Sequence, residues 1–399
     1  MVQCILFFFS VLLVLPSQAK SDYQLEVRGN KRTKESYLEH LFSDCWEESE
    51  EGKSEEKVIE QCIYNNKIFS SVKVIKKGKK KFLLEVEEKW TLLLIPYFQR
   101  QEGSSSYGLF AVETNLMGYG KTGILGYIGG GLNQMLFLMY KDKELFYSPY
   151  SLKLDLFLRE KEYERREGER VVDIFKEKGR DFSGALGRYF WGKRLNLALF
   201  ASDENFTYSR VVNYQLPESY HQIWVGPQVN IDWWDYKHYF QEGLKFTAQH
   251  EFATKKLSSS PKKAHRLYAD LDMEKEIFLQ TALAFRVEYY RGIHTDVRSN
   301  YKFGQKRGSR GIQSGSLWPN NFISLGLDYL IPVLEYSYGS YVAAPYYDWG
   351  KSDDVSYHSY GGGIYLYLSK INLSAVGFVA GYNKNFDKNF FTFTIGRGF

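Results

Sequence analysis

The chain of 399 residues lacks the motifs that mark most enzymes. Its seven histidines are scattered without an i, i+4 pair and its three cysteines form no Cys-x-x-Cys motif, so we predict no metal site. No Gly-x-Ser-x-Gly elbow occurs, which excludes a lipase of that type. Gly120-Lys121-Thr122 imitates the end of a phosphate-binding loop, but Asn115 occupies the place of the required first glycine. We therefore assign no catalytic residue and no cofactor, and we expect a protein that is not an enzyme.

Charge and hydropathy exclude two further classes of protein. The net charge is only +5, and the lysines occur in short runs such as 79–81 instead of on the continuous basic face that nucleic-acid binding requires. We expect no nucleic-acid partner. Beyond the first residues no apolar run is long enough for a transmembrane helix, and the mean hydropathy is negative. These values are compatible with a transmembrane β-barrel, because its lipid-facing side chains occupy only alternate positions.

Residues 1–19 have the pattern of a secretory signal peptide. An apolar run covers residues 5–15, and Ser17-Gln18-Ala19 supplies small residues at the cleavage positions, so we expect the mature chain to start near Lys20. An uncleaved membrane anchor is the alternative. The apolar run is, however, shorter than the ~20 residues that span a bilayer.

Residues 20–89 predict a small α+β domain. Apolar periodicity gives the order strand, helix, helix, strand, strand, with the last two strands joined by a turn at Gly78. Cys45 and Cys62 fall in this segment, which the signal peptide would direct to an oxidising compartment. We expect the two cysteines to lie close enough to form a disulfide because the two helices pack on the same side of the sheet. Two buried thiols are the alternative.

Residues 90–399 predict an antiparallel β-barrel, because short alternating runs are separated by turn residues throughout. The 32 tyrosines, 29 phenylalanines and 34 glycines fit a transmembrane barrel with aromatic girdles. We expect about sixteen strands, at 91–100, 107–115, 121–127, 133–141, 151–160, 182–190, 195–208, 221–234, 243–252, 267–276, 278–291, 321–331, 340–349, 359–368, 373–383 and 390–399. The long loops 161–180, 209–220 and 292–320 then share the extracellular side.

Three motifs follow one another in the C-terminal third of the chain. They are Arg310-Gly311, Asp328 and Asp348-x-Gly350. Asp328 shares the polar face of its strand with Ser324 and Gly326, so alternation places its carboxylate in the lumen. An arginine on a loop that entered the lumen could pair with such carboxylates through its planar set of donors.

The order of these motifs resembles that of the BamA and TamA type of outer-membrane assembly and translocation barrels, a class of bacterial surface antigens. The resemblance implies that Arg310 meets Asp328, Asp348 or both inside the barrel. Residues 20–89 are in turn similar to a single POTRA domain, with Gly29-Asn30 after the first strand. This likeness implies a domain in the periplasm and a barrel in the bacterial outer membrane.

The resemblance also implies a function, which is to assist the insertion or passage of other polypeptides through a lateral seam between the first and last strands. The seam should be weak because Pro96 lacks an N–H donor and Gly396 and Gly398 lack side chains for packing. Phe399 completes an ending similar to the insertion signal of outer-membrane barrels. Expected partners are outer-membrane lipids, unfolded client polypeptides, and periplasmic chaperones or accessory lipoproteins. The alternative is a passive pore plugged by the sixth external loop.

Overall fold

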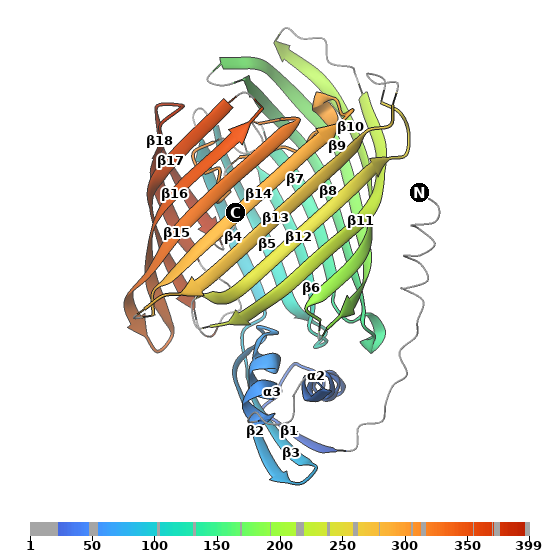
Figure 1. Ribbon diagram of the computed structural model, residues 1–399, viewed down its shortest axis with the longest axis vertical. Coiled ribbons are helices and arrows are strands. Elements are labelled where there is room, and N and C mark those ends of the chain that lie inside the picture. Colours follow the sequence, from blue (N-terminus) through green and yellow to red (C-terminus); the bar gives the residue numbers. More distant parts are fainter. Residues whose placement is uncertain are drawn as a thin grey trace.

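The computed structural model describes residues 23–47, 55–101, 104–130, 133–167, 170–191, 193–212, 219–237, 240–257, 262–278, 280–304, 306–312, 317–353, 355–368, 370 and 376–395. Within these residues the chain forms a small N-terminal α+β domain and a large antiparallel β-barrel (Figure 1). The small domain lies at one end of the barrel, which is called the domain end below, and the opposite end is called the far end. The predicted fold class is confirmed.

The N-terminal domain has the order of elements expected from the sequence. Its elements are β1 (Gln24–Arg28), α2 (Glu35–Glu47), α3 (Glu55–Tyr64), β2 (Phe69–Gly78) and β3 (Lys81–Glu88). The sheet has the order β1-β3-β2, with β1 parallel and β2 antiparallel to β3. Apolar side chains of both helices, among them Phe42 and Ile59, pack against Phe82 and its neighbours in one core. Among the described residues, neither of the two α-helices is long and apolar enough to cross a membrane.

A disulfide joins the two helices of this domain. Cys45 of α2 and Cys62 of α3 are bonded, with their Cα atoms 5.8 Å apart. Cys45 is fully buried within the core. The bond therefore fixes the helices to each other on one side of the sheet.

Sixteen strands make up the barrel, as the sequence predicts. Each pairs antiparallel with its neighbour in the chain, in the order β19 to β4. The strands are β4 (Leu92–Gln101), β5 (Ser104–Leu116), β6 (Lys121–Gly129), β7 (Asn133–Asp142), β8 (Tyr150–Glu167), β9 (Arg170–Phe190), β10 (Leu195–Val212), β11 (Ser219–Tyr236), β12 (Gln241–Ala253), β13 (His265–Glu276), β14 (Ala282–Ile293), β15 (Asn321–Tyr336), β16 (Gly339–Ser352), β17 (Val355–Leu368), β18 (Val376–Asn383) and β19 (Lys388–Ile395).

Two of the predicted long loops are wrong. β8 and β9 continue through most of residues 161–180, and β10 and β11 continue into residues 209–220. Residues 161–180 are rich in charge, as a solvated loop would be. Above the rim of the barrel, however, a β-hairpin can carry polar side chains on its outer face while alternate aromatic side chains pack inward. Those inward side chains include Tyr163, Phe175, Tyr208 and Tyr220, which share one buried cluster.

The two faces of the barrel wall have opposite chemistry. Charged residues are buried on the inside, among them Glu177, Glu251, Arg266, Asp328 and Asp348. Large apolar side chains are exposed on the outside, among them Leu94, Leu109, Leu125, Leu138, Ile364, Phe378 and Phe391. This arrangement is the inverse of a water-soluble fold and is typical of barrels that face hydrocarbon.

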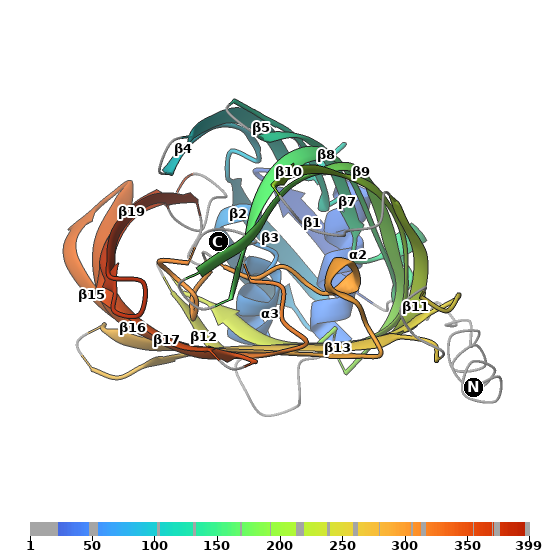
Figure 2. The same cartoon turned by 90° about the horizontal axis from the view of Figure 1, so that it is seen from above.

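The first and last strands do not pair along their described residues. The hydrogen-bonded order of the sheet begins at β19 and ends at β4, without a described ladder between these two strands. Their ribbons are neighbours around the wall in Figure 2. The expectation that β4 and β19 close the barrel by hydrogen bonding is therefore not met by the described residues. Gly396, Gly398 and Phe399, expected at this seam, lie outside the described residues.

Candidate functional site

The described residues of the loop between β14 and β15 lie in the lumen (Figure 2). The loop leaves the far end of the barrel after Ile293 and lies inside the ring of strands, where Figure 2 shows it in orange. A short 3-10 helix, η2 (Val297–Ser299), is capped by the Asp296 carboxylate, which accepts from two backbone N–H groups. An antiparallel β-bridge between Phe303 and Leu317 then joins the two sides of the loop. The tip of the loop carries the first sequence motif.

Arg310 lies at this tip, between two strands of the wall. Its Nε and Nη2 donate hydrogen bonds of 2.9 and 2.6 Å to the two carboxylate oxygens of Asp348, and its Nη1 donates one of 2.7 Å to Asp328 Oδ1. The backbone N–H of Arg310 donates a further bond of 3.0 Å to Asp348 Oδ2. Arg310 is only 7% exposed, so these charge-assisted bonds form away from bulk water.

Strand register explains why the two acids face one arginine. Asp348 of β16 lies opposite Gly326 of β15, so Asp328 is two positions further along the same inward face. Tyr346 lies directly opposite Asp328, and its ring centroid is 3.7 Å from the Arg310 guanidinium carbon. The guanidinium group is thus held by two carboxylates at its edge and an aromatic ring at its face.

A second arginine of the loop belongs to the same network, although it is part of none of the three sequence motifs. Arg307 Nη1 donates to Asp272 Oδ1 at 3.1 Å. Its Nε lies 2.7 Å from Asp328 Oδ2, an ion pair whose N–H is not aligned for a hydrogen bond. Without Arg307, one arginine would face two buried carboxylates. A signal was present, because β13 carries acids at alternate positions, at Asp270 and Asp272.

Two motif glycines are required by close contacts. Gly311 has a φ of +80°, and a β-carbon there would lie 2.6 Å from Cε1 of Phe390 in β19. A β-carbon at Gly350 would lie 2.1 Å from the hydroxyl oxygen of Tyr357. The absence of a side chain at Gly350 therefore leaves room for Tyr357 beneath the loop. Its absence at Gly311 allows the loop to lie against the last strand.

Other parts of the loop are anchored nearer the far end. The Tyr301 hydroxyl donates a hydrogen bond of 2.8 Å to Glu251 Oε1, and Lys302 forms an ion pair with Glu177. The ring of Trp318 packs edge-on against Phe175, with centroids 5.0 Å apart. The loop is therefore bound to the inner wall along its length and not only at Arg310.

The N-terminal domain is docked onto the turns at the domain end. The backbone N–H of Lys34 donates to the Gly118 carbonyl in the β5–β6 turn at 2.9 Å, and Asn115 Nδ2 donates to Thr33 Oγ1 at 2.9 Å. On the opposite side, the backbone N–H of Tyr236 donates to Asn65 Oδ1 at 2.9 Å. These contacts hold the domain across the mouth of the barrel.

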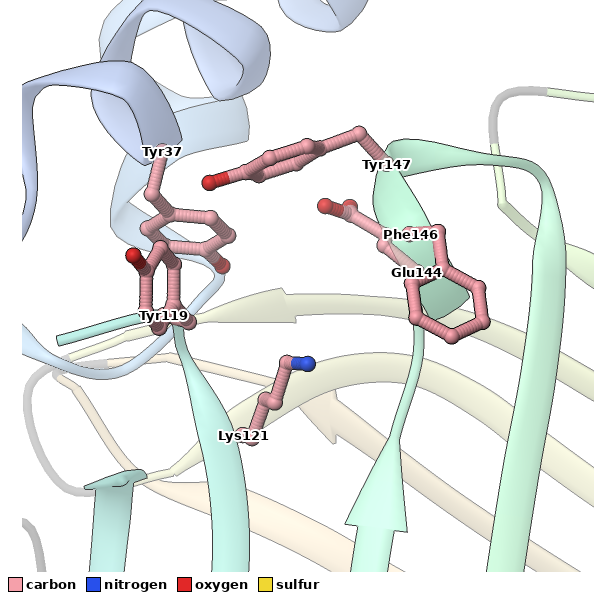
Figure 3. Close-up of a pocket in the computed structure, with 6 residues that line it drawn as sticks. All are labelled: Tyr37, Tyr119, Lys121, Glu144, Phe146 and Tyr147. Carbon is pink, nitrogen blue, oxygen red and sulfur yellow. The ribbon is translucent and has the colours of Figure 1, made fainter. Parts of the chain in front are cut away.

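A small cavity of about 200 Å³ lies in this interface. Figure 3 shows Tyr37 of α2 facing Tyr119 and Tyr147 from two barrel turns. The other lining residues are Lys121, Glu144 and Phe146. Lys121 and Glu144 are already paired, with Asp142 and with neighbouring basic groups, so the cavity offers no unpaired charge to a ligand.

Beside this cavity, four ionisable groups join the domain to the barrel. His40 Nε2 lies 3.4 Å from Asp44 and 3.2 Å from Glu144, and Lys193 forms ion pairs with both carboxylates. The first three groups have the composition of a metal site. The ammonium group of Lys193 already supplies the positive charge. Burial acts to raise the pKa of Glu144, but the hydrogen bond with His40 and the charge of Lys193 outweigh it and lower the pKa to about 2.

Sixteen antiparallel strands around an inserted loop, with a small α+β domain at one end, define an antiparallel β-barrel with a loop in its lumen. No protein-family model matches the chain, and no curated protein matches it. Several solved structures, however, are similar to it. The BamA structure from Haemophilus ducreyi lacking POTRA domains 1-3 is similar with a TM-score of 0.53 and 14% identity, over 96% of this chain and 86% of that chain.

Two CdiB structures are similar as well. CdiB from Escherichia coli has a TM-score of 0.57 and 11% identity, over 94% of this chain and 74% of that chain. CdiB from Acinetobacter baumannii has a TM-score of 0.52 and 11% identity, over 90% and 70%. At these identities the similarity concerns the fold. The resemblance predicted from the motifs is confirmed at that level.

Proposed function

We propose that this protein resides in the bacterial outer membrane, with its POTRA-like domain in the periplasm, and assists the insertion or passage of other polypeptides through the seam between β4 and β19. One observation carries the proposal: a sheet otherwise continuous over sixteen strands has no described ladder at that seam. Where neighbouring strands form no ladder, backbone groups are costly in hydrocarbon, so such an edge is a template for an incoming strand.

The exposed apolar side chains on the outer face support the membrane location. The far end is then extracellular, because the N-terminal domain occupies the other end. Partners of this protein are outer-membrane lipids and unfolded client polypeptides. The seam needs neither a catalytic residue nor a cofactor.

The loop acts as a brace for the seam. Arg310 fixes the tip of the loop to β15 and β16, and the adjacent Gly311 lies against Phe390 of β19. The position of the last strand is thereby linked to the buried ion pairs. A client that displaces β19 must disturb this contact.

A passive pore is the second candidate function. It is disfavoured because protein segments occupy the lumen. The loop and its anchors occupy the interior, while aromatic side chains of β8 to β11 pack over it toward the far end. At the domain end, the N-terminal domain covers the mouth. Water and solutes would need both obstacles to move.

Depletion of the protein in its own bacterium tests the proposal. We expect the outer-membrane level of one or more client barrels or secreted proteins to fall, while their synthesis is unchanged. A depleted strain that keeps its full set of outer-membrane proteins but loses permeability to small solutes would support the passive pore instead.

A further inference from the structure

Three of the seven histidines meet on the outer surface at the far end of the barrel. His250 comes from β12, His265 from β13, and His294 follows β14 directly. His250 Nε2 lies 3.1 Å from His265 Nδ1, and the ring centroids of His265 and His294 are 6.4 Å apart. Phe252 stacks nearly parallel to the His265 ring. Antiparallel pairing therefore gathers residues that are far apart in the sequence.

The partners of these histidines differ from those of the other described histidines. His40 and His221 lie against carboxylates, and His358 shares a hydrogen bond with the Tyr347 hydroxyl. Over the described part of the chain, His250 and His265 instead share a hydrogen bond between two imidazoles. Their facing nitrogens come from neighbouring strands, so one ion beside both could accept a lone pair from each ring.

We propose that His250 and His265 bind a divalent transition-metal ion, with His294 as a third ligand. Two nitrogens bound to one ion at ~2.0–2.1 Å are separated by ~2.9 Å at a right angle and by ~3.4 Å in a tetrahedron. The observed 3.1 Å lies between these values. On binding, the proton shared by the facing nitrogens moves to the opposite nitrogen of its own ring, so both imidazoles stay neutral.

The donor atoms of the site select the class of ion. The His250 and His265 side chains are half-buried, whereas the His294 side chain is exposed directly after its strand. Imidazole donors suit Zn²⁺, Cu²⁺ and Ni²⁺, whereas Mg²⁺ and Ca²⁺ prefer oxygen ligands. Water would complete the coordination shell. This site lies away from the seam and does not depend on the proposed function.

Titration of the full chain with Cu²⁺ tests the proposal. The protein is folded in detergent micelles, carries no polyhistidine tag, and is followed by electron paramagnetic resonance. We expect saturation at one equivalent, with splitting from at least two nitrogen ligands. His250→Ala and His265→Ala should each weaken binding at least ~10-fold, since each removes a coordinating nitrogen.

The matched control is His358→Ala, a histidine outside the cluster, which should leave the affinity unchanged. Heat-modifiable gel mobility verifies that every variant retains the folded barrel. Equal affinity in His250→Ala, His265→Ala and the unmodified chain would overturn the proposal. So would a loss in His358→Ala as large as theirs, or the absence of a saturable signal from folded protein.

Discussion

Gly311 lies against the ring of Phe390, so closely that a β-carbon at position 311 would be 2.6 Å from Phe390 Cε1. Gly311 also has a φ of +80°, a conformation that residues with a side chain rarely adopt. Phe390 belongs to β19, the strand at the seam. The contact joins the lumen loop to the part of the wall that the proposed function requires to open.

Gly311→Ala should therefore loosen the loop and the last strand together. The added methyl group meets Phe390, and the left-handed backbone costs about 1–2 kcal/mol in any residue with a β-carbon. We expect a lower thermal unfolding temperature of the barrel and faster proteolysis near β19. Gly362→Ala in β17 is the control, because a β-carbon there meets nothing within 4 Å. Equal behaviour of the two variants would contradict the brace.

Arg310→Ala should lower the free energy of unfolding of the barrel more than the removal of an exposed ion pair does. It leaves Asp348 and Asp328 buried with fewer donors, a loss of about 3–5 kcal/mol. Arg310→Lys should recover only part of the loss, because an ammonium group cannot donate to both Asp348 oxygens in the same way. Unfolding in urea measures both effects. Lys275→Ala, which removes an ion pair at a 76% exposed lysine, should leave the stability almost unchanged, because solvent screens that pair.

Reduction of the Cys45–Cys62 disulfide should destabilise the N-terminal domain and leave the barrel intact. The bridged residues are 17 apart in sequence. Closing a loop of that size contributes about 3 kcal/mol, chiefly by restricting the unfolded chain. The melting transitions of the N-terminal domain and of the barrel are both measured on the full chain, with and without reductant. A barrel transition that shifts as much as the domain transition would show that the bond stabilises more than its own domain.

Acid should release the N-terminal domain from the barrel turns. Glu144 has a folded-state pKa of about 2, below the ordinary 4.5, so its contribution is present above about pH 4.5 and is lost as the pH falls toward 2. Asp44, His40, Lys193, Lys121 and Asp142 share this region. A fluorophore pair on α2 and the β7–β8 turn would report the separation. Glu144→Gln should weaken the docking of the domain at neutral pH and remove this acid step; an unchanged acid transition would contradict the assignment.

Much of the fold could be predicted because its signals are local. Alternation along β15 placed Asp328 in the lumen, and the spacing of turns gave sixteen strands. The charged segment 161–180 misled the prediction, since charge on a hairpin above the rim resembles charge on a loop. In that segment the inward Tyr163 and Phe175 were the better guide.

Contacts between distant elements could not be predicted in the same way. Arg307 carries no motif, and its role depends on Asp272 of β13, which the register brings to the loop. The docking of the N-terminal domain depends on single residues in separate turns, such as Gly118 and Tyr236. The histidine cluster likewise forms only when three strands align.

A disulfide that locks the seam tests whether client polypeptides enter between β4 and β19. One cysteine is placed in β4 and one in β19, and several pairs within 92–97 and 388–392 are oxidised. Val112→Cys with Ile124→Cys, which face each other on β5 and β6, is the control for an added disulfide within a permanent ladder.

The direct measurement is the folding of an unfolded client barrel added to lipid vesicles that contain the purified protein. Client folding is scored by heat-modifiable mobility, and the unmodified chain is assayed with and without reductant to account for Cys45–Cys62. We expect that a locked β4–β19 seam abolishes client folding, that reductant restores it, and that the β5–β6 control keeps full activity. Full activity of the locked seam would show that clients do not enter between β4 and β19.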